Sequence, residues 1–250
     1  MTTPWPFAQW GLDIMGPFPI ATRQLKFLVV GIDCFTKWVE AEPLATTTEK
    51  NIWCFVWKNV VCWFGIPRVL VSNNSKQFDK EAFRDFCQQL GIKNHYSSLA
   101  HPQASGQVEV TNRSLLKIIK TWLEGAKGVW LDKLPSVFWA YRTTERTPTG
   151  ETPFPLAFKS EVVILEKVGL TSFRVAHHDE WKNDEAIHLQ LDLLDKLWTA
   201  SRQQMAHYQH LMVKYYNTNI RHRHFKVGDL VLKKVTTATR DPTKGKLGLN

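Results

Sequence analysis

The feature that most constrains the fold is an almost unbroken apolar run at residues 26–35, KFLVVGIDCF. A strand with apolar residues at consecutive positions has both faces covered, which is typical of interior strands in a sheet flanked by helices. A shorter run of this kind, 69–73 (VLVSN), ends where the chain breaks at Asn73-Asn74-Ser75-Lys76. The carboxyl ends of strands are where α/β proteins tend to place functional side chains. We therefore expect an α/β sheet with functional chemistry close to residue 73.

The other segments alternate strand and helix patterns, which predicts a mixed α/β domain of about 160 residues. Further strands are expected at 10–18, 36–44 and 92–98. Helices are expected at 48–64, 80–91, 105–124 and 130–145, the last kinked at Pro135 or starting there. Residues 146–158, RTPTGETPFPLAF, are rich in turn formers and are expected to be a loop.

A long helix is expected at 183–217 because its apolar positions recur with a spacing that alternates between four and three residues. These positions are Ile187, Leu191, Leu194, Trp198, Ser201, Met205, Tyr208, Met212 and Tyr215. The pattern fits a coiled coil between chains, and it fits equally a long helix packed on its own domain. Both alternatives stay open at the level of sequence.

The net charge of +9 favours a polyanionic partner such as nucleic acid. The four cysteines, Cys34, Cys54, Cys62 and Cys87, lie in apolar runs without zinc-ligand spacing, which predicts buried free thiols in a reducing compartment. No signal peptide is evident, and no apolar run approaches the roughly 18 residues that a membrane helix needs. We expect a soluble intracellular protein.

Three carboxylates are candidates for chemistry. Asp13 interrupts an apolar strand, where a buried carboxylate is costly unless it binds a cation or a good donor. A hydrogen-bonded structural aspartate is the alternative. Asp33 is interpreted as a turn or cap residue. Glu109 lies in the first turns of the helix at 105–124, on a side that also carries amide and basic groups, although a solvated surface would look the same.

Several motifs in order resemble the integrase core of a plant gypsy-type long-terminal-repeat retrotransposon, over roughly residues 4 to 160. They are PWPFAQWGLDIMGPFP, FTKWVEAEPL, FGIPRVLVSNNSKQF, HPQASGQVEVTN and WLDKLPSVFWAYRTTERTPTGETPF. The resemblance implies a ribonuclease H-like fold, a five-stranded mixed sheet flanked by helices. It divides the chain into a catalytic core (1–160), a linker (161–182), a long helix (183–217) and a truncated β domain (218–250).

In the family that the motifs resemble, an Asp-Asp-Glu triad holds two Mg²⁺ or Mn²⁺ ions, with thirty-five residues between the second and third carboxylates. Asp13 matches the first and Glu109 the third, so the second falls on Asn73, since 109 − 73 − 1 = 35. An amide is a weak ligand and a poor bridge between hard cations. Its loss of charge is expected to slow two-ion strand transfer by on the order of 10³-fold or more. The sequence therefore resembles a degenerate integrase.

Binding to DNA is expected to survive the loss of the carboxylate, because phosphate contacts do not need the triad. The candidate contacts are Gln103, Asn112, Arg113, Lys117 and Lys120, with a second basic patch at 221–234. The resemblance also implies a nuclear location. Two other functions remain open, a polynucleotidyl transferase or nuclease that still works with two metal ions, and an interaction protein that self-associates through residues 187–215.

Overall fold

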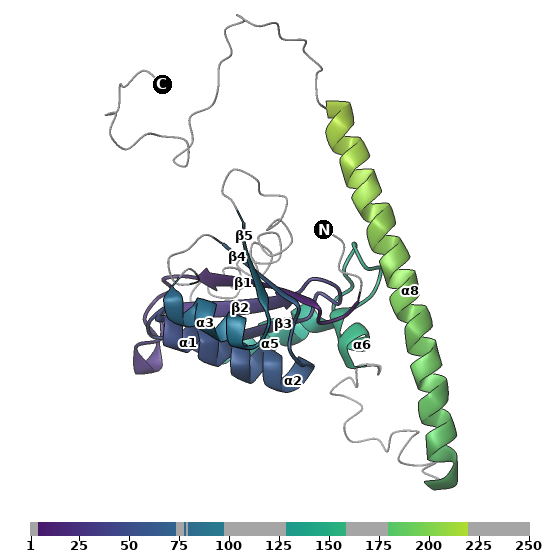
Figure 1. The fold of residues 1–250 in the computed structure, drawn as a ribbon, viewed down its shortest axis with the longest axis horizontal. Helices are drawn as coiled ribbons and strands as arrows, with labels where there is room; N and C mark the ends of the chain where they lie inside the picture. The colour runs from purple at the N-terminus through teal and green to yellow at the C-terminus, as the bar shows by residue number, and fades with distance from the viewer. Residues whose placement is uncertain (1–4, 74–77, 79, 98–128, 159–179, 220–250) are drawn as a thin grey trace, which may run out of the picture.

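The computed structural model describes residues 5–73, 78, 80–97, 129–158 and 180–219. Its centre is a five-stranded mixed sheet of order β3-β2-β1-β4-β5 (Figure 1). The strands are β1 (Gln9–Met15), β2 (Phe27–Asp33), β3 (Val39–Leu44), β4 (Val69–Asn73) and β5 (Lys93–Ser97). The first three strands pair antiparallel, whereas β4 runs parallel to both β1 and β5. The expected five-stranded mixed sheet is confirmed.

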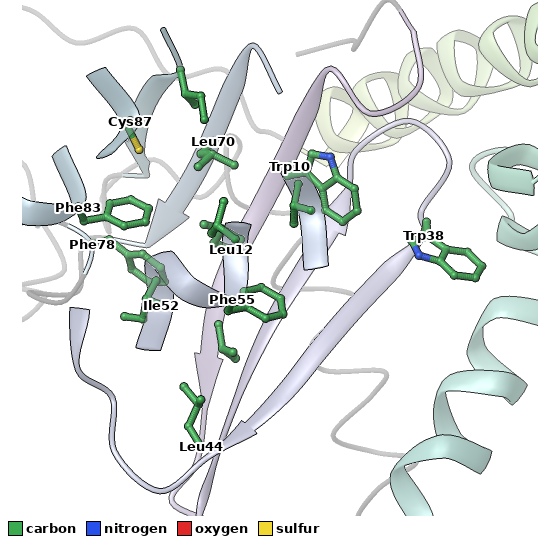
Figure 2. Close-up of a cluster of buried hydrophobic side chains, with 14 residues drawn as sticks. Trp10, Leu12, Trp38, Leu44, Ile52, Phe55, Leu70, Phe78, Phe83 and Cys87 are labelled. Atoms are coloured by element: carbon green, nitrogen blue, oxygen red, sulfur yellow. The ribbon is translucent and has the colours of Figure 1, made fainter. Parts of the chain in front are cut away.

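One face of the sheet is covered by a helical segment that runs without a break through α1 (Glu49–Phe55), η2 (Val56–Val61) and α2 (Cys62–Phe64). The Oγ1 of Thr48 caps its start by accepting the Asn51 N–H, and Gly65 ends it at φ +85°. The helix α3 (Glu81–Gln89) lies beside it on the same face (Figure 1). Burial of large apolar side chains such as Trp10, Phe55 and Phe83 holds these layers together (Figure 2).

The helix α5 (Trp130–Thr143) covers the other face of the sheet. Its Trp130 is buried, and its indole N–H donates to the carbonyl of Pro19 (2.9 Å). Of the two alternatives expected for Pro135, a start of the helix at this residue was wrong, because Pro135 lies inside the helix. A proline removes only one backbone hydrogen bond there, and the burial of Leu134 and Val137 on both sides of it offsets that loss.

The expectation of a loop throughout 146–158 was also wrong in part, since Pro153–Phe158 form the short helix α6. Proline is well tolerated at the first position of a helix, where its missing N–H would have no intrahelical partner. The hairpin before α6 does have turn geometry, with Gly150 at φ +67° and an isolated bridge between Arg146 and Glu151. The turn-forming residues therefore predicted the hairpin correctly, but they also led to the prediction of a loop where α6 lies.

The helix α8 (Glu180–Asn219) includes the expected helix at 183–217 and lies alongside the sheet domain (Figure 1). The middle of its apolar seam packs on the chain's own core: Leu194, Ser201 and Met205 are buried. The indole N–H of Trp198 donates to the carbonyl of Leu156 in α6 (3.1 Å). Over this stretch the structure therefore favours intramolecular packing over a coiled coil.

The expectation of buried thiols needs correction, and burial also differs among the tryptophans. Trp10 and Trp130 are core residues, whereas Trp5 and Trp139 are 49% and 41% exposed. Of the four free cysteines only Cys87 is buried, and Cys62 is exposed. Apolar neighbours in the sequence do not settle burial, because a helix shows part of each turn to solvent. None of the helices within the described ranges is both long and apolar enough to cross a membrane.

A candidate active site at the carboxyl end of β4

Strand register brings Asp13 and Asn73 together. The strands β1 and β4 run parallel, and Leu12 pairs with Ser72. The next residue on each strand is Asp13 and Asn73, respectively, so the two positions lie side by side in the middle of the sheet. On its other side Asn73 pairs with Ser97 of β5. Two positions sixty residues apart in the sequence thus become neighbours because of the parallel pairing.

Asp13 lies at the boundary between the core and solvent. Alternation along β1 places Leu12 in the core beneath α1, whereas Asp13 is on the opposite face and only partly buried. Its Oδ1 accepts the N–H of Ile14 (2.8 Å). A carboxylate held in this way by its own backbone has a fixed orientation at the strand, as expected of a functional group placed on a rigid element.

The other predicted site residues lie outside the described part of the chain. These are Glu109, Gln103, Asn112, Arg113, Lys117 and Lys120. Within the described residues, no group of three or more His, Cys, Asp or Glu side chains is placed to hold a metal ion. Of the candidate metal ligands, the described part of the chain contains one carboxylate, Asp13, and the amide-bearing residue Asn73. Mg²⁺ prefers anionic oxygen ligands, and of these two residues only Asp13 offers one.

The chain just after Asn73 is anchored by a network that sequence reasoning missed. Phe78 is fully buried, and its carbonyl accepts the hydroxyl of Tyr96 (3.0 Å) and the amide N–H of Asn94 (3.5 Å). The same amide donates to the Tyr96 hydroxyl (2.9 Å). The polar residues at alternating positions of β5 were the available signal. Asn73, which pairs with Ser97, and Phe78, five residues later, are thereby both attached to β5.

Asp33 is the last residue of β2 and its side chain caps the following turn, in line with its interpretation as a turn or cap residue. Its fully buried carboxylate accepts the N–H of Phe7 (3.0 Å) and both the N–H and the hydroxyl of Thr36 (each 2.7 Å). Burial raises its pKa to about 6, against the opposing effect of the hydrogen bonds from Thr36. Asp33 pairs with Trp10 and Asp13 with Val30, so the two carboxylates lie at different levels of the sheet.

The sequence is similar to a known family model and to retroviral polyproteins. Residues 4–102 match the family model described as "Integrase core domain". The chain is 34% identical over 145 residues to the Gag-Pol polyprotein of woolly monkey sarcoma virus, covering 58% of this chain and 8% of the polyprotein. It is 35% identical over 154 residues to that of feline leukemia virus, covering 61% and 9%. The chain thus spans less than a tenth of the length of these relatives.

Solved structures show a similar fold. The simian T-cell lymphotropic virus intasome in complex with PP2A regulatory subunit B56 gamma aligns with a TM-score of 0.55 at 20% identity, covering 66% of this chain and 59% of that chain. The HTLV-2 integrase catalytic core domain in complex with magnesium aligns with a TM-score of 0.49 at 18% identity, covering 62% and 98%. Residues 4–102 therefore match the integrase core domain, and the five-stranded mixed sheet flanked by helices shares its fold with the chain of the intasome structure.

Proposed function

We propose that this protein is an integrase-type DNA-binding protein, of a gypsy-type long-terminal-repeat retrotransposon, in which Asn73 impairs strand transfer. The observation that carries the proposal is the strand register that puts Asn73 directly beside Asp13. The match to the integrase core domain and the excess of nine basic residues support the choice of DNA as the partner. The motifs in the sequence are the support for the gypsy-type origin and for a nuclear location.

The impairment follows from charge. With Asp at the second position, the proposed triad of Asp13, residue 73 and Glu109 would have three negative charges, but with Asn73 it has two. An amide has a single neutral carbonyl oxygen to offer a cation, and its NH₂ group presents donors, which repel one. Asp13 and Glu109 are the proposed residual metal ligands for Mg²⁺ or Mn²⁺. Gln103, Asn112, Arg113, Lys117 and Lys120 are the proposed DNA contacts, and none of them depends on residue 73.

The direct test is strand transfer of a labelled terminal DNA duplex into plasmid DNA in Mn²⁺ or Mg²⁺. We expect Asn73→Asp to raise the rate by on the order of 10³-fold or more over the wild type, because it restores the missing anionic ligand. Asn74→Asp is the matched control, since it makes the same chemical change one residue away and should leave the rate unchanged. Equal activity of the wild type and Asn73→Asp would contradict the proposed impairment.

Self-association through residues 187–215 is a second candidate, and the exposed end of α8 favours it. Met212 and Tyr215 belong to the apolar seam but are exposed in the described structure, as is the neighbouring Leu211. Exposed apolar side chains in a row favour a protein partner. We expect a dimer or larger species that persists in high salt and is lost in Met212→Glu. A wild-type monomer by light scattering would contradict this candidate.

A further inference from the structure

The helix α8 carries a second stripe of side chains, which faces away from the core. It consists of Lys196, Gln203, His207, His210 and Lys214, with spacings of seven, four, three and four residues. All five side chains are exposed. At 3.6 residues per turn, the middle of this outer stripe lies about 180° around the helix from Leu194, Trp198, Ser201 and Met205. The packing of α8 on the core therefore leaves the outer stripe accessible.

The charges of α8 are divided along its length. The acidic residues Glu180, Asp184, Glu185, Asp192 and Asp195 all lie in its first sixteen residues. From Lys196 to Asn219 there is no Asp or Glu, whereas three Lys or Arg and two His side chains occur. The outer stripe thus begins where the acidic residues end. The exposed Asp192 lies on the same face, one turn before Lys196, and no carboxylate of α8 follows it along the stripe.

Two structural explanations account for little of this pattern. Basic residues near the carboxyl end of a helix stabilise it through the macrodipole, but that effect falls off within about one turn. Lys196 and His207 lie much farther than one turn from the last residue, Asn219. Ion pairs along the helix explain only Lys196, which has Asp192 four residues before it. For His207, His210 and Lys214 no carboxylate lies within four residues on the helix.

We propose that the outer stripe of α8 binds the phosphate backbone of duplex DNA. The proposal rests on the proposed function and extends its DNA-binding surface beyond the core. Lys196 and Lys214 are eighteen residues apart, which is about 27 Å along the helix and less than one turn of B-form DNA. Phosphate groups lie along this whole length, so both ammonium groups and the side chains between them can meet phosphates of a single duplex.

The outer end of the stripe brings two donors to one place. His210, Val213, Lys214 and Thr218 line an open surface hollow of about 390 Å³. Phosphate oxygens accept hydrogen bonds from the ammonium group of Lys214 and from an imidazole N–H of His210, whereas the Thr218 hydroxyl donates to the carbonyl of Tyr215 (2.8 Å). Such contacts fix a protein on DNA without reading base sequence, so binding by this face is expected to be independent of sequence.

The test is the salt dependence of binding between the full chain and a fluorescent 30-base-pair duplex of arbitrary sequence. Each phosphate contact that is lost reduces the log–log slope by about 0.9. For Lys196→Gln/Lys214→Gln we expect a slope about 1.8 less steep and affinity roughly 60-fold weaker at 0.1 M salt. The charge-preserving variant Lys196→Arg/Lys214→Arg should retain the wild-type slope, which separates loss of charge from damage to the helix.

Arg202→Gln is the matched control for Lys214→Gln. Arg202 is exposed on the same helix, about a third of a turn away from the outer stripe. Each variant removes one positive charge, and only Lys214→Gln should change the slope. An equal change in both variants would mean that net charge alone decides binding, which overturns the proposal.

Three further outcomes are decisive. Unchanged binding by Lys196→Gln/Lys214→Gln, with normal binding by the wild type, would overturn the role of α8 and leave the proposed DNA-binding function intact. No binding by the wild type would contradict the DNA-binding function itself. Displacement of DNA by polyglutamate at the same concentration of charge, with the same loss in the double variant, would assign the stripe to an acidic protein instead.

Discussion

Residue 73 is an asparagine, whereas the motif resemblance implies an aspartate at this position. The two side chains differ only in an amide in place of a carboxylate. Asparagine and aspartate have nearly the same shape, so the strand register of β4 with β1 and β5 can be kept with either. The difference is electrostatic, because an amide cannot supply the negative charge that divalent ions require. A substitution between Asn and Asp at this residue can therefore change the charge of the site without a change in the strand pairing of the sheet.

Asp33 gives a prediction about pH at the same scale. Its pKa of about 6 in the folded protein exceeds the value of about 3.9 in an unfolded chain. The folded state therefore binds this proton more tightly, and the stabilisation is complete below about pH 4 and lost as pH rises through about 6. We expect this group to lower the free energy of unfolding by roughly 3 kcal/mol across that window.

Urea unfolding at pH 4, 5, 6 and 7 checks the effect of Asp33. Asp33→Asn should be less stable overall, since its NH₂ group cannot accept the hydrogen bonds from Thr36. Relative to the variant, the wild type should lose its advantage as pH rises from 4 to 6. A constant difference between the two proteins over that range would contradict a raised pKa.

At the scale of elements, Arg142 connects α5 to the edge strand β3. Its guanidinium donates to the carbonyl of Val39 from Nε and Nη2 (3.1 and 2.7 Å) and pairs with Glu40 (3.1 Å). It also stacks over the ring of Trp38, 4.2 Å from the centroid. Partial burial lowers the pKa of Arg142 and raises that of Glu40, while their mutual attraction opposes both changes.

Replacement of Arg142 by Lys tests this connection. The ammonium group of a lysine is not planar, so it cannot donate twice to the carbonyl of Val39 and stack on the ring of Trp38 at the same time. We therefore expect a loss of about 1–3 kcal/mol in the free energy of unfolding. Arg68→Lys is the control, because Arg68 is exposed and lies 5.6 Å from the ring of Trp5. Its effect should be within about 0.5 kcal/mol. Comparable losses in urea unfolding would show that the connection does not matter.

The attachment of α8 can be tested with two adjacent leucines. Leu194 is buried (4% exposed), whereas Leu193 is 54% exposed. We expect Leu194→Ala to cost about 2–4 kcal/mol and to speed hydrogen exchange in α8. Leu193→Ala should change stability by about 0.5 kcal/mol or less. Similar effects of the two substitutions, by urea unfolding and exchange mass spectrometry, would contradict the packing described here.

Some helices and strands were predicted from the sequence, and others were missed. The strands and α1–α3 were predicted because apolar periodicity and the stop signal at Gly65 act locally. The helix α6 was missed because its two prolines resemble turn residues, while its stability comes from contacts such as buried Leu156 with distant parts of the chain. The network of Asn94, Tyr96 and Phe78 also joins distant residues. The alternating polar residues of β5 are a local signal, but they do not identify Phe78 as the partner.

At the scale of the whole molecule, the order β3-β2-β1-β4-β5 decides which candidate residues can act together. The resemblance to the integrase core implied that positions 13 and 73 belong to one site, and the parallel pairing of β1 with β4 places them side by side. No sequence pattern by itself determines this adjacency, because it depends on a crossover through the helices between the two strands. The remaining site residues stay predictions from sequence.

The most direct measurement of the central claim is calorimetric titration of Mn²⁺ into the wild type, Asn73→Asp and Asp13→Asn/Asn73→Asp. A restored carboxylate beside Asp13 should lower the dissociation constant by on the order of 100-fold, about 2.7 kcal/mol, and removal of Asp13 should reverse the gain. Binding of two ions by the wild type as tightly as by Asn73→Asp would contradict the account.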